Sequence, residues 1–229
     1  MQPSTHMDEI RRVSTSRPLN ASRGDAVNTD SLSQTMHLMG ATMAYPHNTE
    51  IFGENEPADY LYKVVSGSVR TYKILSDGRR QVGGFYLPGD IFGLEFSDEH
   101  TLSAEAISDA KVLVVKSSAL SALAARDPSV AQQLFALTGR ELHRVQDRIL
   151  LLIKNARERV AGFLLEMAER ASENNAIELP MSRQDIADYL GLTIETVSRT
   201  LTSLETASAI EVSASSRRIV LRNRAALAA

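Results

Sequence analysis

Several residue types and patterns that define whole classes of protein are missing from this 229-residue sequence. It has no cysteine, which excludes disulfides, thiolate zinc sites, thiol switches and cysteine-ligated iron–sulfur clusters. No apolar run approaches the roughly 18 residues that a membrane helix needs, and the N-terminus lacks the apolar segment of a secretory signal. These absences favour a cytoplasmic protein without a membrane partner, and the length is enough for about two domains.

The short patterns of common enzyme classes are also missing. The sequence contains no Gly-x-Ser-x-Gly, no P-loop and no His-x-His. Metal-binding β-rolls such as the cupins usually hold two or three histidines and a carboxylate on neighbouring strands. We therefore expect no catalytic residue and no metal site, and we keep a cupin-like enzyme only as an alternative.

Positive charge is not in excess either, because the formal net charge is −3. Residues 1–150 carry 15 Lys and Arg against 18 Asp and Glu, and residues 151–229 carry 10 against 10. Any nucleic-acid surface must therefore be a local patch. One candidate patch, which is equally well read as a solvated tail, follows residue 210 and contains Arg217, Arg218, Arg222 and Arg224 against the single acid Glu211.

Residues 34–126 have the texture of an antiparallel β-roll, after a polar segment over residues 1–33 that we expect to be a disordered tail. Between Tyr45 and Lys116, short runs rich in β-branched and aromatic residues recur about every ten residues. The runs are "YLYKVV", "SVRTYKIL", "QVGGFYL" and "KVLVV", and they are separated by turns at Gly67, "SDGRR" and "LPGD". This spacing is typical of a sandwich or jelly roll.

Residues 127–154 are predicted to form one long helix. Asp127 can cap it, and Pro128 suits its first position because the missing N–H is not needed there. At ~1.5 Å per residue the helix would be nearly 40 Å long. Its apolar stripe approximates the spacing of a coiled-coil seam, which indicates a dimer interface, although the stripe could instead pack on the β-roll. The stripe runs through Leu134, Leu137, Leu142, Val145, Ile149 and Leu152, and it includes position 138, where the residue is Thr138.

Residues 155–229 have the pattern of a winged helix-turn-helix. An amphipathic helix over 156–173 places Val160, Phe163, Leu164 and Met167 on one face. Two helices follow in "SRQDIADYLGLTIETVSRTLTSLE". We expect Ser182 with Asp185 to cap the first helix, and Ile186, Ala187 and Leu190 to form its inner face. Gly191 would make the turn, and Thr193 would cap the second helix. Two short strands near 209–212 and 218–222 would form the wing. The predicted class is α+β.

The second of these helices has two faces. Ile194, Val197, Leu201 and Leu204 fall on one side, which we expect to face the core, and Glu195, Ser198 and Arg199 fall on the other. Arginine can donate two hydrogen bonds to guanine, glutamate can accept one from cytosine, and serine can do either, so we predict that these three residues read bases. The alternative is an ordinary solvated face. For the DNA backbone we expect contacts from Ser182, Thr193, Thr196, Arg217 and Arg218.

The order of these elements resembles the cyclic-AMP-receptor/FNR family of bacterial transcription regulators. The resemblance covers roughly residues 40–224 and is carried by "YLYKVVSGSVRTYK", "LPGDIFGLE", "RERVAGFLLEMAER", "SRQDIADYLGLTIETVSRTLTSLE" and "RRIVL". Glu195, Ser198 and Arg199 match the Glu-x-x-Ser-Arg pattern of the FixK type. The resemblance implies a homodimer that binds a palindrome with TTGA-type and TCAA-type arms, contacts RNA polymerase and activates transcription. The targets it implies are genes of low-oxygen or nitrogen-linked respiration.

Two departures from the family narrow the subgroup. The absence of cysteine excludes the iron–sulfur cluster that FNR holds. Members that bind cyclic nucleotides have a Gly-Glu pair and an Arg-Ser for the phosphate, whereas here Leu94 separates Gly93 from Glu95 and residues 96–110 contain no Lys or Arg. Four acids, Asp98, Glu99, Glu105 and Asp109, would repel a phosphate.

The expected cofactor content is therefore none, as in FixK-type regulators, which lack a bound sensor. No cyclic nucleotide is expected as a partner. A haem or other small effector is the alternative within the same family, because some relatives use one and His47 and His100 fall in the β-roll region. A β-roll interaction module whose helical tail only dimerises is an alternative from another class.

Overall fold

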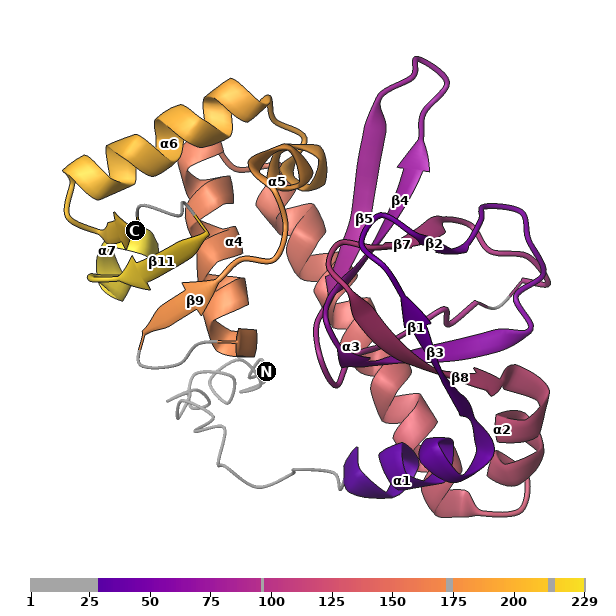
Figure 1. Cartoon of the computed structure of the whole chain (residues 1–229). Helices are drawn as coiled ribbons and strands as arrows, with labels where there is room; N and C mark the ends of the chain where they lie inside the picture. The colour runs from indigo at the N-terminus through magenta and orange to yellow at the C-terminus, as the bar shows by residue number, and fades with distance from the viewer. Residues whose placement is uncertain (1–28, 96, 172–174, 214–216, 229) are drawn as a thin grey trace, which may run out of the picture.

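The computed structural model describes residues 29–95, 97–171, 175–213 and 217–228. A β-roll lies on one side, a long helix runs along it, and a smaller helical domain with a short sheet follows at the far end of that helix (Figure 1). This arrangement confirms the predicted α+β architecture of β-roll, long helix and helix-turn-helix domain. Residues 1–28, most of the predicted tail, lie outside the described residues.

The first described element is the helix α1 (Thr29–Met39), so the predicted tail boundary at residue 33 falls inside a helix. Leu32 and Met36 are 2% and 0% exposed, and the Leu32 amide donates to Gln133 Oε1 at 2.7 Å. These contacts are long-range in the sequence. Composition alone therefore could not show that this polar stretch is held on the long helix.

Within the described residues, two antiparallel four-stranded sheets form the β-roll, in the strand orders β1-β8-β3-β6 and β2-β7-β4-β5. Val64, Val69 and Val112 are fully buried between them. The strands are β1 (Ala41–Tyr45), β2 (Glu50–Phe52), β3 (Tyr60–Ser66), β4 (Val69–Ile74), β5 (Arg80–Tyr86), β6 (Ile91–Phe92), β7 (Ser103–Ala106) and β8 (Ala110–Lys116). The four predicted runs correspond to β3, β4, β5 and β8.

The β3–β4 connection depends on a glycine. Gly67 has φ +77°, and a Cβ atom there would lie 2.2 Å from the Asp109 carbonyl oxygen. The predicted turn at Gly78 likewise has positive φ and joins β4 to β5 in a hairpin that extends beyond the rest of the roll (Figure 1). The hairpin lies beside the helical domain, and this position matters for the site.

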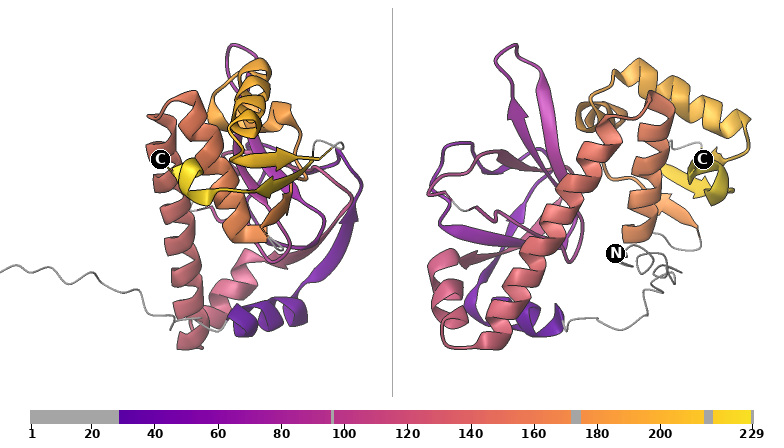
Figure 2. Two further views of the ribbon diagram at one scale, coloured as in Figure 1. Left: turned by 90° about the vertical axis from the view of Figure 1, so that its left-hand side faces the viewer. Right: turned by 180° about the vertical axis from the view of Figure 1, so that it is seen from behind.

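After α2 (Ser117–Ala124), the long helix α3 (Pro128–Leu152) begins and ends as predicted. Asp127 Oδ1 accepts from the Ser129 amide at 2.9 Å, which confirms the cap. Figure 2 shows α3 lying lengthwise against the β-roll. Its buried side includes Val130 and Leu137. Its other side exposes large apolar residues, namely Phe135, Leu142, Val145, Ile149 and Leu150, and Ile153 directly after the helix is exposed as well.

The predicted seam on α3 is therefore divided in two. Leu134 packs against the cluster that includes α1 and α2, and the Thr138 hydroxyl donates to the Leu134 carbonyl at 3.0 Å instead of presenting an apolar group. Leu142, Val145 and Ile149 are 55–58% exposed, and Leu152 is half-buried. Only the C-terminal part of the stripe is thus available to a partner.

The C-terminal domain consists of α4 (Ala156–Ala171), β9 (Ala176–Glu178), α5 (Arg183–Leu190), α6 (Ile194–Thr206), β10 (Ile210–Val212), β11 (Arg218–Leu221) and α7 (Arg224–Ala228). The predicted inner face of α4 is buried throughout. The two predicted wing strands are present, and β9 adds a third in the order β10-β11-β9. Three residues give too short a pattern to predict β9 from the sequence.

Candidate nucleic-acid interface

The helix-turn-helix is built by the local interactions that its sequence indicates. Ser182 caps α5: its Oγ accepts from the Asp185 amide at 3.1 Å, while the Ser182 amide donates to Asp185 Oδ2 at 3.0 Å. Gly191 ends α5 in the left-handed region at φ +63°. Thr193 Oγ1 then accepts from the Thr196 amide at 3.2 Å and starts α6. Cap, turn and second cap are all confirmed.

The helix α6 separates into a buried and an exposed side. Val197, Leu201 and Leu204 are at most 3% exposed, as predicted. Ile194 is 37% exposed, so its assignment to the core was wrong. As the first residue of α6, it lies beyond the end of the domain core. The helix lies on the outside of the domain, away from the β-roll (Figure 1).

The exposed side of α6 presents the three predicted base-reading residues together. Glu195 and Arg199 are exposed and one helical turn apart, and Ser198 is half-buried between them in sequence. The pKa of Glu195 is lowered, first by its own backbone amide, then by the Thr193 hydroxyl and by Arg199. The carboxylate is therefore an ionised acceptor at neutral pH. One acceptor and one fork of donors on a single exposed face can address the edges of neighbouring base pairs.

The predicted backbone contacts lie around this face. Ser182, Thr193 and Thr196 are at the N-termini of α5 and α6, where amides and hydroxyls suit phosphate oxygens. Arg217 and Arg218 are exposed on the wing, Arg218 being opposite Glu178 in the β11–β9 register. The rest of the basic patch is weaker than the sequence indicated, because Arg222 Nε lies 2.9 Å from Glu211 Oε2 in an ion pair.

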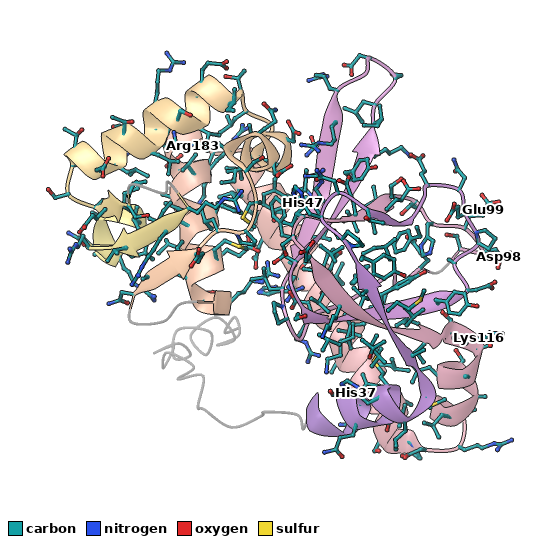
Figure 3. All side chains as sticks on the ribbon, viewed as in Figure 1. His37, His47, Asp98, Glu99, Lys116 and Arg183 are labelled. Atoms are coloured by element: carbon teal, nitrogen blue, oxygen red, sulfur yellow. The ribbon has the colours of Figure 1, made fainter. Side chains whose placement is uncertain are left out.

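Sequence reasoning missed two arginines next to the reading face. Arg183, which Figure 3 labels, is the first residue of α5. It donates from Nη1 to Ser198 Oγ at 3.2 Å and so holds the hydroxyl of a predicted reader. Arg157 of α4 donates to Ser203 Oγ of α6 at 3.3 Å. The position of Arg183 directly after the Ser182 cap is a signal that could have identified it. Arg157 has no such signal, because α4 and α6 meet only in the folded domain.

Comparison with known proteins identifies the two halves of the chain. Residues 42–127 match the model of the cyclic nucleotide-binding domain, and residues 158–229 match the Crp-like helix-turn-helix domain. A nitrogen fixation regulation protein, FixK, from Azorhizobium caulinodans is 50% identical over 200 residues, which cover 85% of this chain and 80% of that protein. This chain belongs to the cyclic-AMP-receptor/FNR family of transcription regulators.

Further relatives place the chain in the FixK type of this family. The structure of FixK2 from Bradyrhizobium japonicum matches with a TM-score of 0.79 and 53% sequence identity, covering 82% of this chain and 96% of that one. The fumarate and nitrate reduction regulatory protein of Salmonella typhimurium is 34% identical over 186 residues, 78% of this chain and 74% of that protein. These relatives are transcription regulators and not enzymes. No helix among the described residues has the length and apolar character to cross a membrane.

The family domain in the β-roll raises the question of a cyclic nucleotide. Between the roll and α3 lies a cavity of about 210 Å³, whose lining includes Phe52, Tyr86, Glu95, Glu141 and Val145 but no Lys or Arg among the described residues. Burial raises the pKa of Glu141. A phosphate placed here would meet Glu95 and Glu141, of which Glu141 is already paired with Arg144 at 2.7 Å, and no Lys or Arg of the lining itself. These lining residues therefore do not fit a nucleotide phosphate.

The four acids that argued against a nucleotide from the sequence turn out to lie in different surroundings. Asp98 and Glu99 are exposed at the outer edge of the roll, on the side away from α6 (Figure 3). Glu105 accepts from Arg70 at 3.1 Å, and Asp109 Oδ1 accepts from the His47 amide at 2.9 Å. The acidic residues that line the cavity are Glu95 and Glu141, and neither was among the four.

The two candidate haem histidines have unlike positions. His47 is exposed in the turn after β1, whereas His100 is 1% exposed and stacks on Phe52 with ring centroids 3.6 Å apart. Burial lowers the pKa of His100, opposed by Glu95, whose Oε1 lies 3.8 Å from Nδ1. Within the described ranges, no group of three or more metal-ligating side chains was found.

Proposed function

We propose that this protein is a homodimeric, sequence-specific activator that reads a TTGA-type palindrome. The observation that carries the proposal is the pair Glu195 and Arg199, ionised and exposed side by side on α6 in a chain 50% identical to a FixK protein. About six base pairs between the TTGA and TCAA arms would place the arm centres one helical turn, ~34 Å, apart. Two copies of α6 related by a twofold axis match such a site.

The dimer is supported by the exposed side of α3. Leu142, Val145 and Ile149 recur at intervals of three and four residues and are each more than half exposed. Isolated surface leucines are common, but a continuous apolar stripe on one helix marks an interaction site. An antiparallel or parallel pairing of two α3 helices through this stripe would bury it, and a twofold pairing also gives the symmetry that a palindrome requires.

The regulator acts without a small effector in this proposal. The cavity beside the β-roll is lined by two carboxyl groups and by no Lys or Arg among the described residues, and the chain has no cysteine for a cluster. The names of its FixK relatives refer to nitrogen fixation. We infer that the target genes serve low-oxygen or nitrogen-linked respiration in the cytoplasm of a bacterium, where the DNA-bound dimer would recruit RNA polymerase.

A gel shift tests the proposal. The full chain is titrated against a duplex with the TTGA and TCAA arms, against a duplex with both arms scrambled, and against one with a single arm. We expect the palindrome to bind at least ~10³-fold more tightly than the scrambled duplex, which is the low end for specific regulators. Equal affinity for the palindrome and the scrambled duplex would refute sequence-specific recognition.

A further inference from the structure

The β-roll and the DNA-binding domain are joined by ion pairs between residues that lie more than one hundred positions apart in the sequence. Asp185 Oδ1 of α5 accepts from Arg70 at 2.6 Å and from Arg80 at 2.7 Å. Arg80 Nε also donates to Asp188 Oδ2 at 2.8 Å. Arg70 and Asp185 are 8% and 4% exposed, so this pair is shielded from water, whereas Arg80 and Asp188 are half-buried. Both strands of the β4–β5 hairpin are thereby tied to the first helix of the helix-turn-helix.

Asp185 has a second role at the same position. Its other oxygen, Oδ2, accepts from the Ser182 amide at 3.0 Å and from the Ser182 hydroxyl at 2.7 Å. One carboxylate therefore both caps α5 and anchors it to the β-roll. The N-terminus of α5 is thus held against the β-roll by the same residue that caps it.

Arg148 of the long helix α3 makes a second connection. Its guanidinium lies 4.4 Å from the centroid of the Tyr189 ring and donates to the carbonyl oxygens of Val82 at 2.5 Å, of Tyr189 at 3.2 Å and of Gly83. A single half-buried side chain thus joins α3, β5 and the last turn of α5. Asp90 adds a third connection on the β-roll side, because it accepts from Arg144 of α3 at 3.1 Å and from Arg170 of α4 at 2.6 Å.

Charged contacts of this kind define geometry more strictly than the apolar contacts beside them. Phe85 of the β-roll packs on Tyr189 with centroids 5.2 Å apart, and such a contact tolerates sliding. Hydrogen bonds from a planar guanidinium have fixed directions. Buried ion pairs add little net stability compared with apolar packing, so their effect here is on the relative position of the domains.

We propose that Arg70, Arg80 and Arg148 are positioning residues that fix α6 relative to α3 and so set the half-site spacing the dimer accepts, without touching DNA. The connection continues to α6 because α5 and α6 share one core across the turn at Gly191. Because these interdomain contacts, called the joint below, are made by side chains of the chain itself, no bound ligand is needed to position α6. The inference rests on the proposed function, because spacing has meaning only for a dimer on a palindrome.

The test is a spacing profile. Affinity is measured for palindromes whose arms are separated by the best spacer and by spacers one and two base pairs shorter and longer. The full-length wild type should lose about tenfold or more at each wrong spacer, as expected when one arm loses its base contacts. For Arg80→Gln and Arg148→Gln we expect weaker binding at the best spacer and differences among spacers of less than about threefold.

Arg79→Gln is the matched control, because Arg79 is the neighbour of Arg80 and its exposed side chain pairs only with Asp77 among the described residues. It should keep the wild-type profile. If Arg80→Gln and Arg148→Gln also keep that profile, even with uniformly lower affinity, the joint is merely structural and the proposal is wrong. Should either variant not fold, Asp188→Asn decides by the same profile, because it removes one partner of Arg80 and leaves the Ser182–Asp185 cap intact.

Failure of this inference is distinguishable from failure of the proposed function. If the wild type shows no preference between palindrome and scrambled DNA, the proposed function fails before any variant is compared. If the wild type is specific and the variants keep both its base preference and its spacing profile, only the positioning inference fails. Support for the inference requires that base preference is retained while spacing preference is lost.

Discussion

At the residue scale, recognition depends on Glu195 and Arg199, the two oppositely charged side chains on the exposed side of α6. Their roles are predicted to differ from those of the wing arginines. A base-reading arginine loses both affinity and discrimination when it is removed, because guanine O6 and N7 lose a bidentate donor. A phosphate-binding arginine contributes to every sequence equally and makes affinity depend on salt.

Arg199→Ala is therefore expected to cost ~1–3 kcal/mol at each half-site and to relax the preference for guanine there. Arg218→Ala is the control: it should weaken all sequences about equally and flatten the salt dependence by roughly one unit of slope. Affinities for single-base operator variants at several salt concentrations separate the two effects. A uniform loss for Arg199→Ala with its base preference intact would show that α6 does not read at this position.

His100 gives a prediction about acid stability. Burial lowers its pKa in the native state, against the opposing carboxylates Glu95 and Glu56, and its ring stacks on Phe52. Below a pH of about 6.5 the unfolded chain takes up a proton that the native chain resists, so stability present at neutral pH is lost as pH falls. This loss can reach ~1.4 kcal/mol per pH unit.

We expect His100→Phe to lose less stability between pH 7.5 and 5.5 than the wild type does, in denaturant titrations. His143→Gln is the control, because His143 is exposed on α3 and only faces Asp147 at 3.4 Å. If wild type and His100→Phe show the same decrease, the native state does not hold His100 in its neutral form.

Residues with local partners were the ones that sequence could predict. The Asp127 cap, the Ser182–Asp185 capping box and the turn at Gly191 each involve residues within four positions of one another. The second role of Asp185 was not predictable, because Arg70 and Arg80 lie more than one hundred positions earlier in the chain. Nothing in the local pattern tells which arginine will meet a given carboxylate after folding.

At the element scale, α3 has two roles, packing within the subunit and exposing an apolar surface, and the spacing of its apolar residues is the same in both parts. Its N-terminal part packs within the subunit, through Val130 and Leu137. Its C-terminal part exposes Leu142, Val145 and Ile149. Sequence spacing predicted the helix and its cap correctly, but it could not show where the β-roll and α1 stop covering the helix. The strands β1, β2, β6, β7 and β9 were not among the predicted runs for a related reason, since they are defined by the strands they pair with.

The double variant Val145→Glu with Ile149→Glu tests the proposed dimer. Two carboxylates per helix would face two from the partner across an apolar seam, so we expect monomers in sedimentation experiments and loss of operator binding. The control is Gln132→Glu with Gln146→Glu, which adds the same charge to exposed polar positions of α3. An unchanged dimer in the Val145 and Ile149 double variant would mean that the seam lies elsewhere.

At the scale of the whole molecule, the β-roll acts as a rigid support. It carries the long helix on one side and holds α5 through Arg70 and Arg80 on another. Its cavity has carboxylates and no cation among the described lining residues, which disfavours an anionic effector. The order of domains could be predicted from the sequence because each has its own periodicity. The way they dock could not, because it depends on side chains that meet only in the folded chain.

The most direct test of this account is the base preference of the purified full-length protein, measured in air with no nucleotide, metal or haem added. Affinity is determined for the TTGA and TCAA palindrome and for every single-base change in both arms. We predict tight binding, with losses of ~1–3 kcal/mol per changed base that are mirrored between the two arms. Strict dependence on an added effector, or losses confined to one arm, would contradict the account of an effector-free symmetric reader.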